Sequence, residues 1–379
     1  MNKKKLPITL GLIVKNEARF LPSCLETLSQ RVKEIIVVDT GSKDKTPHLA
    51  SQYGARLIRF ESKEFHYGKA RNVYLDYATQ PWILSLDADE RISEIDQRRL
   101  GKLLKSKDVH GYHFWIRNYN DEFNLLSDWY PNRGKYPEEE RTAGTHGWFR
   151  TSDLRLFRND LRFRYQGRVH ASVKYSICHH RGIIRTAPFP IHHFECLKGS
   201  RFILRKQRNY VRQTSKELMD SPDFAKVYLD VGIGLFSLKR GDKKAISHLR
   251  KCLRIKPGHP DAHKYLGMIF LENDNMGSAI RHLRSALLRD SKNADLHCLL
   301  GLAFLRQGRY QGALAYLQDA LRYHKDHAVA THLKGRAYEY LGKNRMAFQS
   351  YRQALRILPI YPPAVKDLKR IRKKILKKP

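Results

Sequence analysis

A 34-residue spacing of small and aromatic residues governs the C-terminal half of this 379-residue chain. Four alanines follow one another at steps of 34 residues: Ala245, Ala279, Ala313 and Ala347. The same step separates three glycines and four aromatic residues: Gly267, Gly301 and Gly335, and Phe236, Phe270, Phe304 and Tyr338. Small residues let paired helices approach closely, while large residues fill the space between neighbouring pairs. The pattern therefore predicts an all-α solenoid of helix pairs.

This half of the sequence resembles a tetratricopeptide-repeat array of about four repeats. Individual repeats depart from the pattern, because Ile233 stands where the others have glycine, and Ser291 and Lys325 stand where Pro257 and Pro359 close the other two repeats. A repeat array of this kind implies binding of a protein or peptide partner, or self-association as a homo-oligomer.

The N-terminal region has a different pattern, in which apolar runs alternate with amphipathic stretches. Four runs have the character of strands: residues 8–14, 34–39, 55–60 and 81–86. Three helices are expected between them. Short strands joined through helices imply right-handed crossovers and an open α/β sheet that is mostly parallel. Ligands of such sheets bind outside the carboxyl ends of the strands.

Carboxylates stand at two of these strand ends. Asp87-Ala88-Asp89 follows the last run, and two carboxylates at positions i and i+2 can face the same side of a strand. That arrangement suits a divalent cation, which would neutralise a nucleotide diphosphate. Asp39 ends the second run, where it could accept the imide N–H of a uracil ring or cap the following turn through Ser42. The two roles of Asp39 are compatible with each other.

Four short motifs occur together within the first 90 residues: Ile13-Val14-Lys15-Asn16-Glu17, Val38-Asp39-Thr40-Gly41-Ser42, Ala70-Arg71-Asn72 and Leu86-Asp87-Ala88-Asp89-Glu90. With these motifs the N-terminal region resembles the bacterial branch of the family 2 glycosyltransferases, which have the GT-A nucleotide-sugar fold. The resemblance is close as far as Ile92 and looser to about Leu204. It implies a GT-A-like α/β domain that transfers a hexosyl or N-acetylhexosaminyl group, with inversion, from a nucleotide-diphosphate sugar, expected to be a UDP-sugar.

The resemblance also implies roles for single residues. The donor would be bound by four side chains: Glu17, Asp39, Arg71 and Asp87. Arg71 lies near the start of a predicted helix, where its guanidinium and free backbone N–H groups could face a diphosphate. Asp89 would hold Mn²⁺ or Mg²⁺ on that diphosphate. His193 would complete the metal site, and an imidazole ligand favours Mn²⁺, although His192 and His193 could equally pack under the sheet.

The general base is missing from the place where the resemblance puts one. Relatives carry a His-Glu pair, whereas this chain reads Gly167-Arg168-Val169-His170-Ala171, and alanine cannot accept a proton. Three explanations stay open: His170 acts as the base, a carboxylate from Asp153 or from the Glu138-Glu139-Glu140 run substitutes, or the chemistry has been lost or changed. A substitute base is favoured, with His170 as its first candidate, and a lone histidine is equally compatible with a structural role.

Residues 129–149 form an aromatic segment within the looser part of the resemblance. Tyr130, Tyr136 and Trp148 stand among charged residues there, which suits a mobile lid or an acceptor-binding loop, since aromatic rings can stack on sugars. The same rings could instead anchor an ordered loop. The sequence does not rank these alternatives.

The chain is strongly basic, with a formal net charge of +35 and a pI near 10.1. Such a charge attracts polyanions. Lysine and arginine crowd the last segment, which could lie against anionic lipid: Lys366, Lys369, Arg370, Arg372, Lys373, Lys374, Lys377 and Lys378. Nucleic acid is an unlikely partner, because no recognition motif is present. Without a signal peptide or a long apolar run, we expect a cytoplasmic protein with peripheral contact at the inner face of the membrane.

These patterns predict four parts: a glycosyltransferase domain at 1–204, a connecting helix or linker at 205–222, repeats at 223–359, and a basic closing helix and tail at 360–379. The leading hypothesis is a metal-dependent glycosyltransferase acting on a cell-envelope glycan, a lipid-linked glycan or a peptide. The alternative is a non-catalytic scaffold that binds a nucleotide sugar or a partner through a decayed transferase site. Ala171 supports the alternative, and the retained Asp39, Arg71, Asp87 and Asp89 oppose it.

Overall fold

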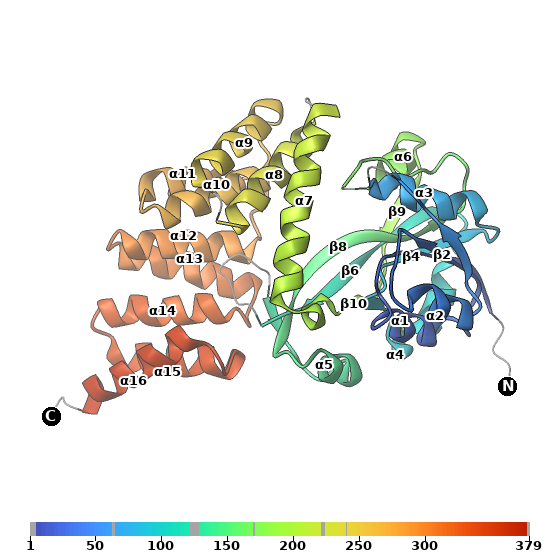
Figure 1. The fold of residues 1–379 in the computed structure, drawn as a ribbon. Coiled ribbons are helices and arrows are strands. Elements are labelled where there is room, and N and C mark those ends of the chain that lie inside the picture. The colour runs from blue at the N-terminus through green and yellow to red at the C-terminus, as the bar shows by residue number, and fades with distance from the viewer. Residues whose placement is uncertain are drawn as a thin grey trace. The chain divides into compact units, whose positions relative to one another are not determined.

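A computed structural model describes residues 5–62, 65–121, 129–169, 171–220, 224–239 and 241–376 (Figure 1). The chain forms two compact units. The first consists of Met1–Tyr119, Gly134–Thr145 and Phe149–Ile203, and the second of Asn120–Arg133, His146–Trp148 and Leu204–Pro379. His170, the first candidate for the general base, lies outside the described residues. Among the described residues, no helix is long and apolar enough to cross a membrane.

The first unit is built on parallel strands that match the four predicted runs. These are β1 (Leu6–Val14), β2 (Val32–Asp39), β3 (Arg56–Arg59) and β4 (Trp82–Leu86), in the spatial order β3-β2-β1-β4. The connecting helices are α1 (Leu21–Leu28), α2 (Thr46–Gln52) and α3 (Tyr67–Tyr77). Val14 pairs with Asp39, and Leu12 pairs with Leu86. The carboxyl ends of β1, β2 and β4 therefore meet at one edge of the sheet.

The sheet continues beyond β4 as β4-β8-β6-β10-β5. Its further strands are β5 (Glu90–Arg91), β6 (Val109–Tyr119), β8 (Gly147–Arg158) and β10 (Ile191–His193), while β7 (Trp129–Pro131) pairs with β8 and β9 (Ile183–Thr186) with β6. Strand β8 is antiparallel to β4, so the sheet is mixed. The intervening helices are α4 (Glu94–Leu103), α5 (Pro137–Ala143), α6 (Lys174–His179) and the 3₁₀ turn η1 (Glu195–Lys198). The predicted α/β fold is confirmed.

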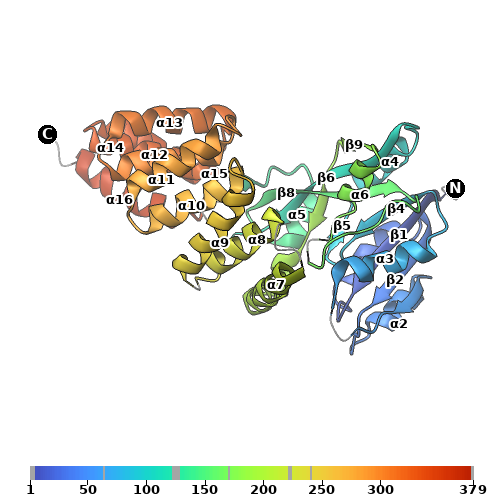
Figure 2. The ribbon, with the colours of Figure 1, turned by 90° about the horizontal axis from the view of Figure 1, so that it is seen from above.

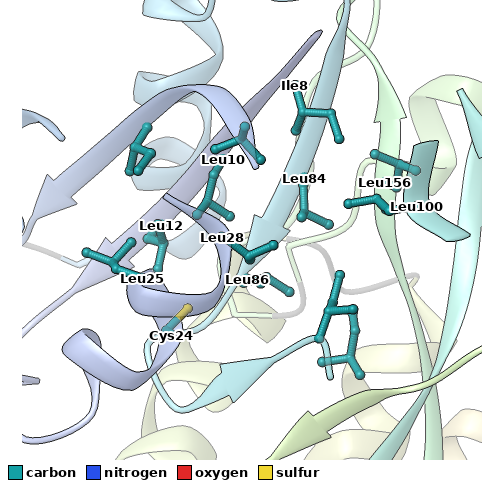
Figure 3. Close-up of a cluster of buried hydrophobic side chains, with 14 of the residues drawn as sticks. Ile8, Leu10, Leu12, Cys24, Leu25, Leu28, Leu84, Leu86, Leu100 and Leu156 are labelled. Atoms are coloured by element: carbon teal, nitrogen blue, oxygen red, sulfur yellow. The ribbon is translucent and has the colours of Figure 1, made fainter. Parts of the chain in front are cut away.

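Central strands β1 and β4 are buried on both faces, which explains their continuous apolar runs. On one face, side chains of β1, β4 and α1 form a core (Figure 3): Ile8, Leu10, Leu12, Leu84, Leu86, Cys24, Leu25 and Leu28. On the other face, Tyr74 of α3 lies directly over Gly11 of β1. A Cβ atom at Gly11 would lie 2.6 Å from Tyr74 Cδ2, so only glycine fits under this ring.

The second unit contains the predicted solenoid (Figure 2). Helix α7 (Ser200–Asp220) precedes four helix pairs, which are α8 (Ala225–Ser237) with α9 (Asp242–Ile255), α10 (Pro260–Glu272) with α11 (Met276–Leu287), α12 (Ala294–Arg306) with α13 (Tyr310–Tyr323), and α14 (Ala328–Tyr340) with α15 (Asn344–Ile357). Helix α16 (Pro362–Leu376) follows them and packs against α15.

The periodic glycines lie where the helices of a pair approach most closely. A Cβ atom at Gly301 would lie 2.6 Å from Leu317 Cγ, and one at Gly267 would lie 2.6 Å from Leu283 Cγ. The first repeat keeps this contact through Gly232, whose Cβ would lie 2.8 Å from Leu249 Cγ. The expectation that Ile233 replaces the glycine was therefore wrong. The connection between α8 and α9 is one residue longer, which moves the glycine out of the 34-residue register.

Part of the aromatic segment at 129–149 belongs to the second unit and is packed there. Trp129 is 4% exposed and joins the buried cluster that includes Leu302 and Leu305. Tyr130 stacks on Trp148 with ring centroids 4.7 Å apart, and its ring lies 4.4 Å from that of His324. This burial agrees with the ordered-loop alternative rather than with a mobile lid.

Candidate active site

The loops after β1 and β2 hold each other through the polar residues of the first two motifs. Asn16 N donates to Ser42 Oγ over 2.9 Å, and Lys43 N donates to Asn16 Oδ1 over 2.7 Å. Glu17 N donates to Thr46 Oγ1 over 2.8 Å. Asn16 adopts a positive φ of 56°, which asparagine tolerates better than most residues. These contacts explain why small polar residues follow both strands.

Asp39 lies buried at the end of β2 and caps the following turn. Its Oδ1 atom accepts hydrogen bonds from Ser42 N at 3.0 Å and from Ser42 Oγ at 2.6 Å. The turn-capping role considered from the sequence is thus present. Recognition of a uracil ring by Asp39 stays a prediction.

Arg71 and Asp87 are brought together. Arg71 Nη2 lies 3.1 Å from Asp87 Oδ1, and Arg71 Nη1 donates to Ser85 Oγ over 3.3 Å. The Asp87 side chain is 37% exposed, so it can still meet a ligand. The guanidinium of Arg71 is therefore fixed beside the first acid of the Asp87-Ala88-Asp89 motif.

Arg155 of β8 is a site residue that the sequence did not identify. Its Nη2 atom lies 2.7 Å from Glu90 Oε1 and 3.4 Å from Asp87 Oδ2, and its Nε atom lies 3.4 Å from Asp153 Oδ2. Burial alone would lower the pKa of Arg155, but these three carboxylates outweigh burial and raise it. Arg155 therefore remains a buried cation that joins three acids.

Glu90 stabilises the Asp87-Ala88-Asp89 motif through a hydrogen bond. Its Oε2 atom accepts a hydrogen bond from Asp87 N at 3.0 Å, and its side chain is almost wholly buried. Burial raises the pKa of Glu90 to about 7, even though Arg155 lowers it. Glu90 thus holds the backbone of Asp87 in place and does not itself face solvent.

Asp89, His193 and Lys198 form the other half of the site. Asp89 Oδ2 lies 3.3 Å from His193 Nε2 and 3.0 Å from Lys198 Nζ. Lys198 Nζ also lies 2.7 Å from Glu17 Oε1. The structure therefore joins Glu17, predicted to bind the donor, to Asp89, predicted to bind the metal, through a lysine that the sequence did not single out.

The orientation of the His193 ring follows from Asn118. Asn118 Nδ2 donates to Thr151 Oγ1 over 2.9 Å, which leaves its Oδ1 atom to accept from His193 Nδ1 at 2.7 Å. His193 Nε2 then faces Asp89. Burial alone would lower the pKa of His193, but Asp89 outweighs burial and raises it. Metal-ligating histidines usually have their other ring N–H fixed by a hydrogen bond, as His193 Nδ1 is fixed by Asn118, so Nε2 is the nitrogen that could bind a metal.

His192 takes the opposite role. Its ring is fully buried, its Nδ1 atom lies 2.8 Å from the Tyr119 hydroxyl, and Tyr136 packs edge-on against it. Burial and the cations Arg117 and Arg91 hold the pKa of His192 well below its usual range. Of the two histidines, His192 packs under the sheet and His193 belongs to the site.

Two parts of the chain match known protein families. Residues 9–162 match the family model described as glycosyl transferase family 2, and residues 266–328 and 298–362 match the tetratricopeptide-repeat model. The chain carries a family 2 glycosyltransferase domain and tetratricopeptide repeats. Most of the site described above lies within the residues that match the glycosyltransferase family, and His193 and Lys198 follow that range in the chain.

Several characterised and uncharacterised proteins are similar to this chain. A TPR repeat-containing protein of Synechococcus elongatus is 30% identical over 260 residues, which cover 67% of this chain and 58% of that protein. Glycosyltransferase SunS of Bacillus subtilis is 23% identical over 266 residues, covering 70% of this chain and 57% of SunS. The lipopolysaccharide core biosynthesis glycosyltransferase LpsC of Rhizobium meliloti is 36% identical over 107 residues, covering 27% of this chain and 39% of LpsC. This chain thus spans less than two thirds of each relative.

Among solved structures, MamA matches with a TM-score of 0.37 and 23% identity, over 40% of this chain and 88% of MamA.

The residues of the glycosyltransferase domain fit a divalent cation at Asp89. A carboxylate and an imidazole nitrogen converge there, a donor pair that suits Mn²⁺. Within the described ranges, no group of three or more His, Cys, Asp or Glu side chains is arranged to hold a metal. A cation at Asp89 would therefore take its remaining ligands from water and the donor diphosphate. Metal dependence stays a prediction.

The candidate bases differ in their surroundings. Ala171 packs against the apolar cluster of Phe157 and Tyr165, where it offers no proton acceptor. Glu140 pairs with Arg117 over 3.0 Å in a buried contact. The Asp153 side chain is 47% exposed, and its Oδ2 atom lies 3.4 Å from Arg155 Nε. Asp153 is joined to Asp87 through a shared cation, because Arg155 contacts both carboxylates.

Proposed function

We propose that this chain transfers a sugar, with inversion, from a nucleotide-diphosphate donor to an acceptor, and that the donor is a UDP-sugar bound with Mn²⁺ or Mg²⁺. Glycosyl transfer follows from the family of the N-terminal domain. The donor and metal assignments are supported by two contacts made within one motif, Arg71 with Asp87 and His193 with Asp89.

In this proposal Arg71 contacts the diphosphate, and Asp87 contacts the ribose or the sugar. Asp39 accepts the imide N–H of the base while Ser42 keeps its carboxylate in position. Asp89 and His193 hold the cation, which when bound stabilises the charge of the leaving nucleoside diphosphate. Arg155 and Glu90 keep Asp87 in place through its side chain and its backbone N–H.

Binding of UDP tests the proposal most directly. Calorimetry of the full chain should show UDP binding with Mn²⁺, and Asp89→Ala should abolish the Mn²⁺-dependent part. Asp108→Ala removes an exposed carboxylate of the same unit and should leave binding unchanged. Equal, Mn²⁺-dependent UDP binding by the wild type and the Asp89→Ala variant would refute the assignment of Asp89 as the metal ligand.

The general base is proposed to be Asp153. Strands β4 and β8 are antiparallel and pair Trp82 with Arg158. Asp87 is five residues after Trp82, and Asp153 is five residues before Arg158. If the antiparallel pairing is continued beyond the end of β4, Asp87 and Asp153 therefore lie opposite each other. One guanidinium, that of Arg155, contacts both carboxylates. In the transfer step, the acceptor atom bonds to the anomeric carbon, the bond to the diphosphate breaks, and the acceptor proton passes to Asp153.

A binding scaffold without catalysis is the second candidate, and Ala171 is the observation that favours it. A scaffold and a transferase differ in whether they release UDP from a UDP-sugar. A scaffold would bind UDP and release no UDP from any UDP-sugar, whereas a transferase hydrolyses its donor slowly when water replaces the acceptor.

The acceptor is proposed to be a cell-envelope glycan presented at an anionic lipid surface. Exposed apolar and basic residues recur together where the second helices of the repeats end: Arg254 with Ile255, Leu288 with Arg289, and Arg322 with Tyr323. Leu288 is 85% exposed. Helix α16 adds further exposed cations. Paired apolar and cationic side chains suit the headgroup region of an anionic bilayer, while the repeats remain available for a protein partner.

A further inference from the structure

Lys198 lies beside Asp89, the carboxylate proposed to hold a divalent cation. Its ammonium lies 3.0 Å from Asp89 Oδ2 and 2.7 Å from Glu17 Oε1. The three side chains are largely withdrawn from solvent, and that of Lys198 is 8% exposed. One buried ammonium therefore contacts two buried carboxylates and offsets part of their charge, which would be costly to bury without a cation.

The fold holds Lys198 in this position from several sides. Its ammonium lies 5.1 Å from the centre of the Phe20 ring and 5.2 Å from that of Phe202. The backbone carbonyl of Leu197 accepts a hydrogen bond from Arg19 Nη1 at 3.2 Å. Because aromatic faces attract cations, these rings favour the charged lysine in the pocket. The surrounding residues thus hold Lys198 within the site, and it is not a surface side chain that reaches the site by chance.

We propose that Lys198 is the resident cation of the Glu17 and Asp89 carboxylates and competes with a divalent metal for Asp89. This inference rests on the proposed function, because it takes Asp89 as the metal ligand. A metal ion at Asp89 and an ammonium 3.0 Å from the same oxygen repel each other. Metal binding therefore requires Lys198 to leave Asp89, and in the absence of a metal the lysine would offset part of the charge of the two carboxylates.

The consequence is that the protein alone should bind Mn²⁺ weakly. The metal must first break a charge-assisted contact, which is worth about 10- to 100-fold in an equilibrium constant. Lys198→Met keeps the length of the side chain and removes its charge. That variant should bind Mn²⁺ about 10- to 100-fold more tightly than the wild type in the absence of nucleotide. A residue with only a structural role would weaken metal binding when replaced.

The test is a titration of the full chain with Mn²⁺ alone, in which electron paramagnetic resonance reports the free aqueous ion. Lys198→Arg keeps a competing cation and should bind Mn²⁺ close to the wild-type level. Lys102→Met, an exposed lysine of α4, is the matched control and should have no effect. Tighter Mn²⁺ binding by Lys198→Met supports the inference, and unchanged or weaker binding overturns it.

Two further variants keep the result interpretable. Should Lys198→Met fail to fold because Glu17 and Asp89 lose their lysine, the double variant Lys198→Met with Glu17→Gln removes one charge of each sign and should also bind Mn²⁺ more tightly. Adding Asp89→Asn should remove the gain, and a gain that persists would overturn the inference. No nucleotide is present in this titration, so a failure of the wild type to bind UDP with Mn²⁺ refutes the proposed function separately.

Discussion

Two glycines of the solenoid should respond to the same substitution with opposite signs. Gly301 lies in the middle of α12, and Gly277 lies in the first turn of α11. Replacing glycine by alanine within a helix stabilises it by roughly 0.5–1 kcal/mol, because glycine loses more backbone freedom on folding. At Gly277 a Cβ atom would have nothing within 4 Å, so Gly277→Ala should raise the free energy of unfolding by about that amount.

At Gly301 the steric cost exceeds this gain. The new Cβ atom would lie 2.6 Å from Leu317 Cγ and 2.7 Å from Leu317 Cδ2, and Leu317 is fully buried. The Cγ atom is close to the backbone of α13, so the side chain cannot swing away and the helices must separate. Overpacking of this kind costs roughly 1–3 kcal/mol. Gly301→Ala should therefore lower the free energy of unfolding by about 1–2 kcal/mol after the helix-propensity gain.

Urea unfolding of the full chain, followed by circular dichroism at a helical wavelength, measures both variants against the wild type. A second substitution, Leu317→Ala, should make the Gly301→Ala change less harmful, since the clashing atoms are gone. Equal stabilisation by Gly301→Ala and Gly277→Ala would refute the reasoning, because it would mean that the periodic glycines are not required by close helix packing.

Three further predictions concern the site and the repeats. Asp153→Asn should slow UDP release from a UDP-sugar by roughly 10²- to 10⁴-fold while leaving UDP binding unchanged, and Asp153→Glu should recover part of the rate; an unaffected rate would remove Asp153 as the base. Glu90 has a folded pKa of about 7 against an ordinary 4.5, so the folded state holds its proton longer and wild-type stability falls as pH rises between these values. Glu90→Gln should therefore gain stability relative to the wild type from pH 5 to pH 7.5 in urea unfolding, and a pH-independent difference would contradict this. Replacing Arg254, Arg289 and Arg322 by Glu should reduce sedimentation with phosphatidylglycerol vesicles, and equal binding by the wild type and the triple variant would argue against the repeat edge as a lipid contact.

Local patterns were enough to predict most of the fold. The first four strands and the three helices between them follow from apolar runs, and the solenoid follows from the 34-residue step, because both depend on neighbours along the chain, whereas the strands after β4 were not predicted. The first repeat shows where this fails. Gly232 performs the contact expected at position 233, since one extra residue in the connection shifts the register without changing the packing.

The histidine pair could have been resolved from the sequence. Successive side chains of a strand point to opposite faces, so His192 and His193 at the end of β10 cannot have the same surroundings. One of them had to face the buried side and the other the site. What the sequence could not supply was Asn118, which pairs with His193 across β6 and β10 and fixes its ring.

Residues missed at the site share one property, which is that their partners are far away in the chain. Lys198 meets Glu17 across 181 residues, and Arg155 meets Glu90 across 65 residues. No local period marks such contacts. A usable signal exists only for Arg155, because a charged residue within the apolar run Leu154-Arg155-Leu156-Phe157 must find a counterion when the strand is buried.

Four acids of the site contact buried or half-buried cations. These pairs are Asp87 with Arg71 and Arg155, Glu90 with Arg155, and Asp89 and Glu17 with Lys198. In the proposed function, a diphosphate would meet charged groups that are already in position, and its binding would exchange partners among them instead of ordering loose side chains. Such preorganisation lowers the entropic cost of binding. Lys198 would be strongly affected by this exchange, because it contacts both Asp89, proposed to bind the metal, and Glu17.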